Sequence, residues 1–412
     1  MAIIVQKFGG TSVANAEKIR RAAARTIRAV QESMQVVVVA SARGKQTDEL
    51  IADALELNPN PSAREMDQLL STGEIQTVSL FAIALEAMGH KAISFTGGQI
   101  RMITDSVHSK ARIKSIDVSR IRKELDSGKI VLVAGFQGVD ENGNITTLGR
   151  GGSDTSAVAL AAALKAKQCD IFTDVDGIYT TDPRLFKAAA KIKQISYDEM
   201  LEMASLGAGV MHGRAVEFGK KYDVKIHVRS SIEETEGTII THEVPKMEDV
   251  IVSGATVQKD MAKISLVGVD NKPGNAAKIF SLIAQAKVVV NDIVQTEVST
   301  EKANLSFTLA ISDLNIAKQA VEQIRKELNI EDVFIREDIA EISVVGVGMR
   351  THYGVADTMF AALAKAKVNI DSITTSEIRI SCIVDKHQAQ QALEAVCLAF
   401  ELDKSAQERN KL

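Results

Sequence analysis

A glycine-rich stretch from Thr147 to Ala157, reading Thr-Leu-Gly-Arg-Gly-Gly-Ser-Asp-Thr-Ser-Ala, most constrains how this chain can fold. It follows a strand-like run over residues 129–135 and precedes an apolar run over residues 157–166 that is typical of a helix. Its glycines allow the backbone to turn tightly and to approach a ligand closely. Because Ser153 and Asp154 are both favourable N-cap residues, we expect the helix to begin there.

The same stretch carries groups that suit an amino acid beside an anion. A helix N-terminus offers free N–H groups and a partial positive charge to a phosphate or carboxylate. Arg150 can grip a carboxylate through two parallel hydrogen bonds, and Asp154 can hold an ammonium group. Taken alone, however, the stretch is equally consistent with a glycine-rich turn closed by a capping pair.

Length and composition exclude several classes of function. At 412 residues the chain is too long for one ordinary domain, so two or three are expected. A net charge of −4, aromatic residues at 4% and no tryptophan argue against a nucleic-acid partner or an anionic membrane surface. No signal peptide and no apolar run of about 20 residues is present, so we expect a cytoplasmic protein. The three cysteines show no metal spacing, which predicts free thiols and no metal ion held by side chains.

The N-terminal residues predict a second anion site. Residues 2–8 are β-branched with little alternation, as in a strand of a parallel sheet that is buried on both faces. Gly9 and Gly10 follow, and then a helical stretch over residues 14–31, which together form a phosphate cradle. Lys7 falls at the carboxyl end of the strand, where open α/β sheets bind ligands. The pattern is not a P-loop, and a lysine at the rim of a sheet without any ligand is the alternative.

Strands and helices continue to alternate toward residue 241. Further strands are expected over residues 35–40, 91–95, 129–135, 169–173, 224–229 and 238–241, and several end in glycine or polar residues. Residues 63–88 are expected to be helical although Gly73 costs about 1 kcal/mol there relative to alanine. Close approach of another group at Glu74 would explain this glycine, and a kinked helix with a solvated Glu74 is the alternative. The acidic loop over residues 173–184 lacks the spacing of a calcium loop.

The remainder of the chain contains an internal repeat. Residues 263–269 match residues 341–347, and residues 284–288 match residues 364–368. Each copy reads as strand, glycine-bearing loop, helix and strand, a unit that pairs into sheets with helices on one face. The two copies can hold a ligand between them or form a purely structural dimerisation module. The predicted domains are residues 1–244, 245–335 and 336–412, with strands around 250–257 and 378–384 free to cross between the last two.

Together these motifs resemble the aspartate kinases of the amino-acid-kinase family. The resemblance is carried by residues 7–12, 71–74, 135–138, 148–157 and 173–184, and the repeat resembles a tandem pair of ACT domains. It implies an α/β fold: a three-layer αβα sandwich with a mostly parallel central sheet, followed by two βαββαβ (ferredoxin-like) ACT domains. It covers nearly the whole chain, and the motifs occur in the family's order.

The resemblance implies transfer of the γ-phosphoryl group of ATP, with Mg²⁺ held mainly through the phosphates, to the side-chain carboxylate of L-aspartate. The product is 4-phospho-L-aspartate, which leads to lysine, threonine and methionine. Catalytic roles are implied for Lys7, Gly10 and Asp154. Nucleotide contacts are implied for Lys7, Phe8, Gly9, Gly10, Thr173, Asp174, Tyr179, Thr180, Thr181, Asp182, Pro183 and Arg184. Substrate contacts are implied for Ser41, Thr47, Glu74, Arg150, Gly151, Gly152, Ser153 and Asp154.

The ACT pair implies feedback inhibition by lysine, threonine or both. Effector contacts are implied for Lys272, Pro273, Gly274, Asn275, Ala276, Asn291, Asp292 and Gln295 in the first repeat, and for Gly354, Val355, Asn369, Ile370 and Glu377 in the second. The expected assembly is a homo-oligomer or an association with an ACT-only form of the same chain that starts at Met247 or Met261.

Three residues depart from the family pattern: Arg43 stands for a methionine, Gly209 for a lysine that contacts the nucleotide, and Tyr353 for a proline. Two other functions stay open. One is a kinase for glutamate, acetylglutamate or a nucleotide, although two carboxylates beside the substrate amine favour a free amino acid. The other is a catalytically silent amino-acid sensor on the same fold.

Overall fold

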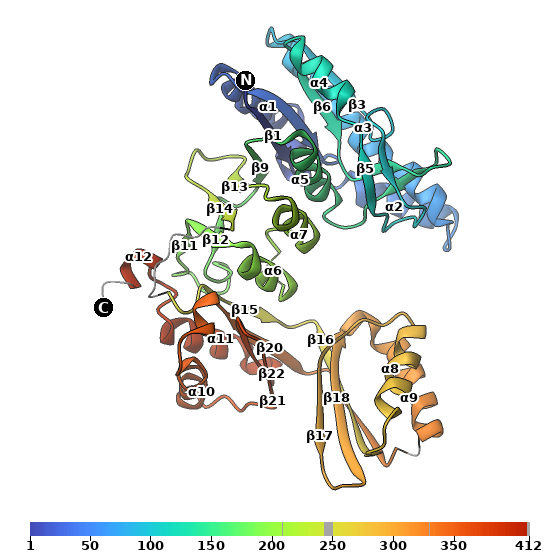
Figure 1. Ribbon diagram of the computed structural model, residues 1–412, viewed down its shortest axis with the longest axis vertical. Coiled ribbons are helices and arrows are strands. Elements are labelled where there is room, and N and C mark those ends of the chain that lie inside the picture. The colour runs from blue at the N-terminus through green and yellow to red at the C-terminus, as the bar shows by residue number, and fades with distance from the viewer. Residues whose placement is uncertain (208, 243–249, 329, 410–412) are drawn as a thin grey trace. The chain divides into compact units, whose positions relative to one another are not determined.

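The computed structural model describes residues 1–207, 209–242, 250–328 and 330–409. The chain forms two compact units, Met1–Tyr179 with Lys191–Met247, and Thr180–Ala190 with Glu248–Leu412 (Figure 1). The first unit contains the glycine-rich stretch, and the second contains the internal repeat. The predicted boundary at residues 244 and 245 lies outside the described residues. No described helix combines the length and the apolar character that crossing a membrane requires.

The first unit is built on an eight-stranded sheet. In chain order its strands are β1 (Ile3–Phe8), β2 (Gln35–Ala40), β3 (Ala92–Phe95), β6 (Ile130–Ala134), β9 (Gln168–Thr173), β12 (Gln194–Ser196), β13 (Ile226–Ser230) and β14 (Thr238–Thr241). They lie side by side in the order β12-β14-β13-β9-β1-β2-β6-β3, and every neighbouring pair except β13 and β14 is parallel. Every residue of β1 is buried, which confirms the prediction of a strand covered on both faces.

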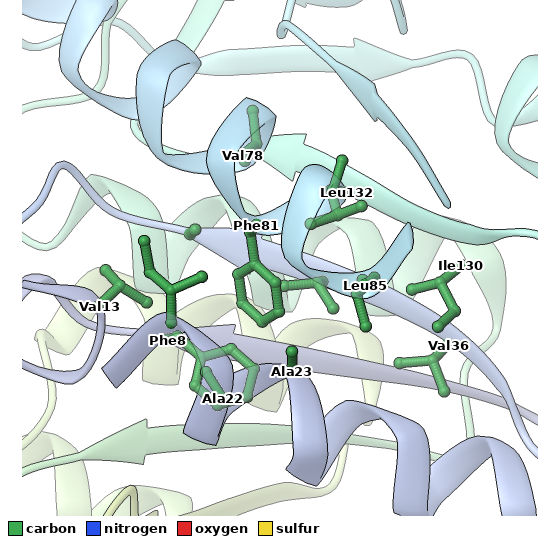
Figure 2. Packing of buried hydrophobic residues seen from close by; sticks show 14 of the residues in the cluster. Phe8, Val13, Ala22, Ala23, Val36, Val78, Phe81, Leu85, Ile130 and Leu132 are labelled. Atoms are coloured by element: carbon green, nitrogen blue, oxygen red, sulfur yellow. The ribbon is translucent and has the colours of Figure 1, made fainter. Parts of the chain in front are cut away.

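Helices cover both faces of this sheet. On one face, α1 (Ala16–Gln31) and α3 (Ala63–Ala87) pack against the even-numbered apolar residues of β1 and β2. Figure 2 shows Phe81 and Leu85 of α3 packed among Phe8, Val36 and Leu132 of the sheet. Helix α5 (Gly152–Leu164) contacts β1, β2 and β9 outside this cluster and covers the opposite face together with α7 (Gly213–Tyr222). The predicted three-layer αβα sandwich with a mostly parallel sheet is confirmed.

Smaller elements frame the edge of the sheet where the glycine-rich stretch lies. A four-stranded sheet has the order β5-β4-β7-β8, with β4 at Met102–Thr104, β5 at Ile113–Ile116, β7 at Gln137–Val139 and β8 at Ile145–Thr147. The helices α2 (Gln46–Leu57), α4 (Ser119–Asp126) and α6 (Tyr197–Ser205) and the strand pair β10 (Ile178–Tyr179) and β11 (Lys191–Ile192) complete the unit. The sequence did not predict the small sheet, because its strands are too short for a periodic pattern to show.

The second unit contains two four-stranded sheets. The first has the order β17-β18-β16-β19 and is formed by β16 (Met261–Asp270), β17 (Val290–Glu297), β18 (Lys302–Ala310) and β19 (Asp332–Arg336), with α8 (Asn275–Gln285) and α9 (Leu314–Leu328) packed on it. The second has the order β15-β20-β22-β21 and is formed by β15 (Gly254–Gln258), β20 (Ile339–Val345), β21 (Ser372–Thr375) and β22 (Arg379–Asp385), with α10 (Val355–Lys365) and α11 (Ala389–Ala399). The short helix α12 (Ala406–Arg409) follows. The repeat therefore folds as two ferredoxin-like domains, as predicted.

The structure shows one strand that crosses between the repeats and one departure from the predicted partition. Strand β15, in the stretch that was left free to cross, precedes the first repeat in the chain but pairs antiparallel with β20 of the second, whereas β22, the other such strand, pairs within the second domain. Residues 180–190, predicted to belong to the kinase domain, lie in the second unit. The physical reason is burial: Phe186 belongs to the apolar cluster formed by β20, α10 and α11. The hydroxyl of Thr180 also donates to the carbonyl of Leu402 at 2.6 Å.

Candidate active site

The carboxyl ends of the central strands bring the predicted catalytic loops to one edge of the large sheet. Backbone hydrogen bonds tie these loops together: the N–H of Ser41 donates to the carbonyl of Phe8 at 3.1 Å, and that of Gly9 donates to the carbonyl of Phe172 at 3.2 Å. The N–H of Gly135 donates to the carbonyl of Ala40 at 3.1 Å. Because parallel strands end at the same edge, residues far apart in sequence meet there.

Lys7 and Asp154 form an ion pair at this edge. The Nζ atom of Lys7 lies 2.6 Å from Oδ1 of Asp154, and each side chain is nearly buried, at 11% and 13% exposed. Lys7 ends β1, and Asp154 stands in the first turn of α5, which packs on β1. In a site shielded from water, two opposite charges attract each other more strongly than at the surface. The sequence predicted separate roles for the two groups, and the structure brings them into direct contact.

Helix α5 begins two to three residues earlier in the stretch than predicted. Its first residue is Gly152 and its N-cap is Gly151, so Ser153 and Asp154 lie within the first turn and neither is the cap. Gly149 and Gly151 have φ angles of +79° and +65°, which glycine adopts without strain. These two residues wind the chain into the helix sooner than a serine cap would. A Cβ atom on Gly151 would lie 2.2 Å from the Cβ of His212, so only glycine fits here.

Glu74 is a buried carboxylate that supports the loop after β2. Helix α3 runs unbroken past it, and a Cβ on Gly73 would lie 2.7 Å from the Cβ of Ala42. The glycine therefore allows close approach of that loop, as the sequence indicated. The Oε1 atom of Glu74 accepts from the N–H of Ala42 at 3.0 Å, while its Oε2 atom has no hydrogen-bond partner among the described residues. Burial raises the pKa of Glu74 from its ordinary value of 4.5 to about 7.

Glu74→Gln is expected to change how stability depends on pH. The folded protein keeps a proton on Glu74 up to about pH 7, whereas the unfolded chain loses it near pH 4.5. The folded state binds more protons in this window, so the contribution of Glu74 to stability is present below pH 4.5 and is lost as the pH rises through 7. The loss reaches about 3 kcal/mol, at 1.36 kcal/mol per pKa unit. Glutamine cannot ionise, so the variant should lack this pH-dependent loss of stability.

The measurement is the melting temperature of the two proteins at several pH values between 5 and 8. We expect the variant to match the wild type near pH 5 and to exceed it at pH 8. Parallel melting curves across the range would contradict a raised pKa for Glu74.

The other predicted contacts occupy the same edge. A Cβ on Gly10 would lie 2.6 Å from the carbonyl oxygen of Ala42, so this turn too requires glycine. Gly10 opens a short 3-10 helix that ends at Val13. Ser41 lies in the loop that follows β2, and Thr47 lies in the first turn of α2, which comes after this loop. Arg150 is exposed, and among the described residues it makes no hydrogen bond and no ion pair, so its guanidinium is available to a ligand.

A pocket of about 700 Å³ opens beside the first turn of α5. Its lining includes Gly151 and Asp154 together with Met211 and His212 of the loop before α7. Sequence reasoning missed His212, because nothing in the chain placed that loop against the glycine-rich stretch. Gly209 also lines the pocket, and a Cβ added to it would meet no atom within 4 Å.

The residues predicted to contact the nucleotide are divided between the two units. Thr173, whose hydroxyl donates to the carboxylate of Asp174 at 3.1 Å, lies at the end of β9 in the first unit. The hydroxyl of Tyr179 donates to Asp176 at 2.8 Å, a carboxylate that the sequence analysis did not select. The predicted residues Thr180, Thr181, Asp182, Pro183 and Arg184 belong to the second unit, where Asp182 and Arg184 form an ion pair at 2.7 Å.

A second pocket, of about 360 Å³, lies in the first ferredoxin-like domain. The predicted effector residues that line it are Lys272, Pro273, Gly274, Asn275, Ala276 and Gln295. Asn291 and Asp292 are not in its lining. The Oδ1 atom of Asp292 instead accepts from Thr374 at 3.0 Å and pairs with Arg379 at 3.3 Å, both in the second domain.

In the second repeat the predicted effector residues are more scattered. Gly354 is the N-cap of α10, Val355 is buried, and Ile370 packs on the apolar cluster of this domain. Asn369 is exposed, and Glu377 pairs with Arg350 at 3.1 Å. Tyr353, which replaces the proline of the family pattern, is fully exposed.

Comparison with known proteins identifies this combination of fold and site. Residues 2–230 match the model of the amino acid kinase family, and residues 342–400 match an ACT domain model. The aspartokinase of Bacillus sp. (strain MGA3) is 48% identical over 98% of this chain and 99% of its own, and aspartokinase 2 of Bacillus subtilis (strain 168) is 47% identical over the same shares. E. coli aspartokinase III in complex with aspartate and ADP (R-state) matches with a TM-score of 0.81 at 26% identity, covering 96% of this chain and 99% of that chain.

The chain therefore belongs to the amino acid kinase family, and within it to the aspartokinases. The predicted class of enzyme is confirmed, and so is the presence of an ACT regulatory domain.

Proposed function

We propose that this aspartate kinase transfers the γ-phosphoryl group of ATP to the side-chain carboxylate of L-aspartate and forms 4-phospho-L-aspartate. The observation that carries the proposal is the Lys7–Asp154 ion pair, which lies where the glycine turn after β1 meets the first turn of α5. A cation, a carboxylate and free backbone N–H groups at one sheet edge suit a phosphoryl group beside an amino acid. E. coli aspartokinase III, which was solved with aspartate and ADP, has the same fold.

The chemistry needs positioning and charge neutralisation more than proton transfer. The side-chain carboxylate of aspartate is ionised at pH 7, so it attacks without a general base. The site must hold two anions together and stabilise charge on the migrating phosphoryl group. In the proposal, Lys7 and the N–H group of Gly10 supply that charge, because the N–H of Gly9 already donates to the carbonyl of Phe172. Mg²⁺ would be held mainly through the phosphates of ATP, where it would neutralise part of their charge.

The amino acid is held at both ends in this proposal. Arg150, which is free of protein partners among the described residues, binds the α-carboxylate. Asp154 and the unsatisfied Oε2 atom of Glu74 receive the ammonium group, and Ser41, Thr47 and Ser153 add hydrogen bonds. Two carboxylates favour a free amine over an acetylated one, because an amide carries no charge to pair with them.

We also propose that lysine, threonine or both inhibit the enzyme by binding the pocket of the first ACT domain. Its loop over residues 270–276 presents backbone groups and the N-terminus of α8 to a small zwitterion. Inhibition then requires that the effector favours one of two states of the enzyme.

Gly274→Asp is expected to relieve this inhibition without changing the uninhibited rate. Gly274 has a φ of +96°, so any side chain strains the loop, and a carboxylate there repels the carboxylate of the effector. The matched control is Gly128→Asp, which places the same side chain at another left-handed glycine, with a φ of +78° and no atom within 4 Å, and which should leave the inhibition unchanged because Gly128 is no predicted effector contact. The readout is the effector concentration that halves the rate. If Gly274→Asp leaves it unchanged, the effector binds elsewhere.

The edges of the ACT sheets suit association with another chain. Strand β17 is an edge strand that leaves Ile293 exposed, and β21 is an edge strand that leaves Ile373 exposed. We propose a homo-oligomer, or a complex with an ACT-only form of the same chain. An ACT-only form that starts at Met261 would lack β15, and Met247 lies outside the described residues.

The test of the proposed function is ATP turnover by the purified protein with aspartate, glutamate or acetylglutamate, each with and without lysine plus threonine. Aspartate-specific turnover that lysine plus threonine suppress would support both parts of the proposal. Turnover without suppression would keep the kinase activity and remove these effectors. Turnover with glutamate or acetylglutamate in place of aspartate would overturn the proposed substrate. An absence of turnover with all three amino acids would overturn the proposed kinase activity.

A further inference from the structure

One buried carboxylate near the active site has no role in the mechanism above. Asp67 lies in the second turn of α3 and is fully buried. Its Oδ1 atom accepts from the hydroxyl of Thr147 at 2.5 Å, and its Oδ2 atom lies 2.8 Å from Nδ1 of His108. Both oxygens also lie within 3.1 Å of the N–H of Ser109. A carboxylate with this many partners fixes their relative positions, because each hydrogen bond is lost if one of them moves.

One partner of Asp67, Thr147, lies directly before the loop that carries Arg150. Thr147 ends β8, and Arg150 follows three residues later. The carbonyl of Thr147 accepts from the N–H of Ala111 at 2.9 Å, so the segment after Ser109 lies against the end of β8. A Cβ on Gly149 would lie 2.9 Å from the carbonyl oxygen of Ser109. The loop of Arg150 and the segment around Ser109 are therefore packed together, and Asp67 holds both.

Helix α3 links this contact to the rest of the site. Asp67, Ser71 and Glu74 recur at the spacing of one helix face. The carbonyl of Ser71 accepts from the side-chain amide of Gln137 at 2.8 Å, and Glu74 accepts from the N–H of Ala42. One rigid face thus supports three loops at the edge of the sheet, and through Asp67 it sets where Arg150 stands relative to Glu74.

We propose that Asp67 is a positioning residue for aspartate binding that acts through Arg150. The inference rests on the proposed function, in which Arg150 and Glu74 hold the two ends of the substrate. Asp67 touches neither substrate nor nucleotide in this assignment. Its carboxylate keeps Arg150 and Glu74 at a spacing that fits aspartate, so that both groups are already in position before the substrate binds.

The test compares Asp67→Asn with Asp140→Asn. Asparagine keeps the size of the side chain but replaces one oxygen by an NH₂ group and removes the charge. With its oxygen at the Oδ1 position, the NH₂ group faces the N–H of Ser109, and with its oxygen at the Oδ2 position, the hydroxyl of Thr147 loses its acceptor. Asp140 is the matched control because it is also a buried aspartate that accepts hydrogen bonds. It is 3% exposed and accepts from Asn142 and Asn144 in the turn before β8, at the end of that strand away from Arg150. Asp67→Asn should raise the KM for aspartate roughly tenfold and leave the KM for ATP within about twofold, while Asp140→Asn should change neither.

A double variant separates positioning from a general loss of structure. If Asp67 acts through Arg150, Asp67→Asn should add almost nothing to the KM for aspartate in the background of Arg150→Ala. Additive effects would overturn the proposal, and so would equal changes in the two KM values. If Asp67→Asn does not fold, Thr147→Val removes one partner of Asp67, and Thr147→Ser, which keeps the hydroxyl, should restore the wild-type KM.

Two outcomes distinguish the role of Asp67 from the assignment of Arg150 to the substrate site. A raised KM in Arg150→Ala but not in Asp67→Asn or Thr147→Val overturns the role of Asp67 alone. An unchanged KM in Arg150→Ala overturns the substrate assignment itself and, with it, the role of Asp67.

Discussion

Replacing Lys7 by alanine is expected to lower kcat about 10²-fold or more while leaving the affinity for ATP largely intact. The lysine is nearly buried and paired with Asp154, so its charge acts where water screens it little. Charge on the phosphoryl group is spread over its oxygens during transfer, and a fixed cation there stabilises the transition state more than the bound nucleotide. The measurement is the steady-state rate at saturating aspartate and ATP, with nucleotide affinity from equilibrium binding.

A suitable control is Lys18→Ala. The Nζ atom of Lys18 donates to the carbonyl of Thr11 at 2.8 Å, so this variant also removes a lysine next to the glycine turn. Its rate should stay near that of the wild type. Because removal of Lys7 leaves Asp154 without its partner, circular dichroism should confirm that the Lys7 variant is folded. A folded Lys7 variant that turns over at the wild-type rate would remove Lys7 from the catalytic role.

Replacing Arg150 by alanine is expected to raise the KM for aspartate by roughly 10- to 100-fold, which corresponds to the loss of a hydrogen-bonded charged group worth about 1.5–3 kcal/mol. Arg150 has no partner among the described residues, so removing it leaves no protein group unsatisfied. The effect should therefore report on the ligand alone. Initial rates at varied aspartate and saturating ATP give the KM, and the KM for ATP should change little.

Arg150→Lys provides the comparison for geometry. Lysine keeps the charge but lacks the planar fork that binds a carboxylate through two parallel hydrogen bonds. We expect its KM for aspartate to fall between those of the wild type and the alanine variant. An alanine variant with the KM of the wild type would exclude Arg150 from the substrate site.

Local patterns in the sequence predicted most of the fold. The buried strands of the large sheet and the repeat of the ACT domains each appear as a run or a match within one stretch of chain. Gly73 pointed to a close approach, and the structure places Ala42 against it. The start of α5 was predicted two to three residues too late, because a serine cap and a left-handed glycine cap cannot be told apart without the backbone.

Contacts between distant segments could not be predicted in the same way. Asp67 looks like an ordinary acidic residue near the start of a helix, where the helix dipole favours it at the surface. Only the fold shows that β8 and the segment around Ser109 bury it. The pairing of Lys7 with Asp154 and the strand order of the second ACT sheet could not be predicted for the same reason. Both depend on which distant segments the fold brings side by side.

The placement of residues 180–190 limits how far the two halves of the enzyme can be exchanged. Thr180 bonds to Leu402 and to the N–H of Ala255, and Phe186 completes an apolar cluster of the second unit. A kinase half cut from the chain near residue 242 would carry Phe186 without the side chains that bury it. A regulatory half transplanted onto another kinase would lack the same piece of its core. The core of the second ACT domain is therefore incomplete without residues 180–190. A chimera should carry them together with the ACT pair, and an ACT-only form of the chain would expose the apolar surface that Phe186 covers.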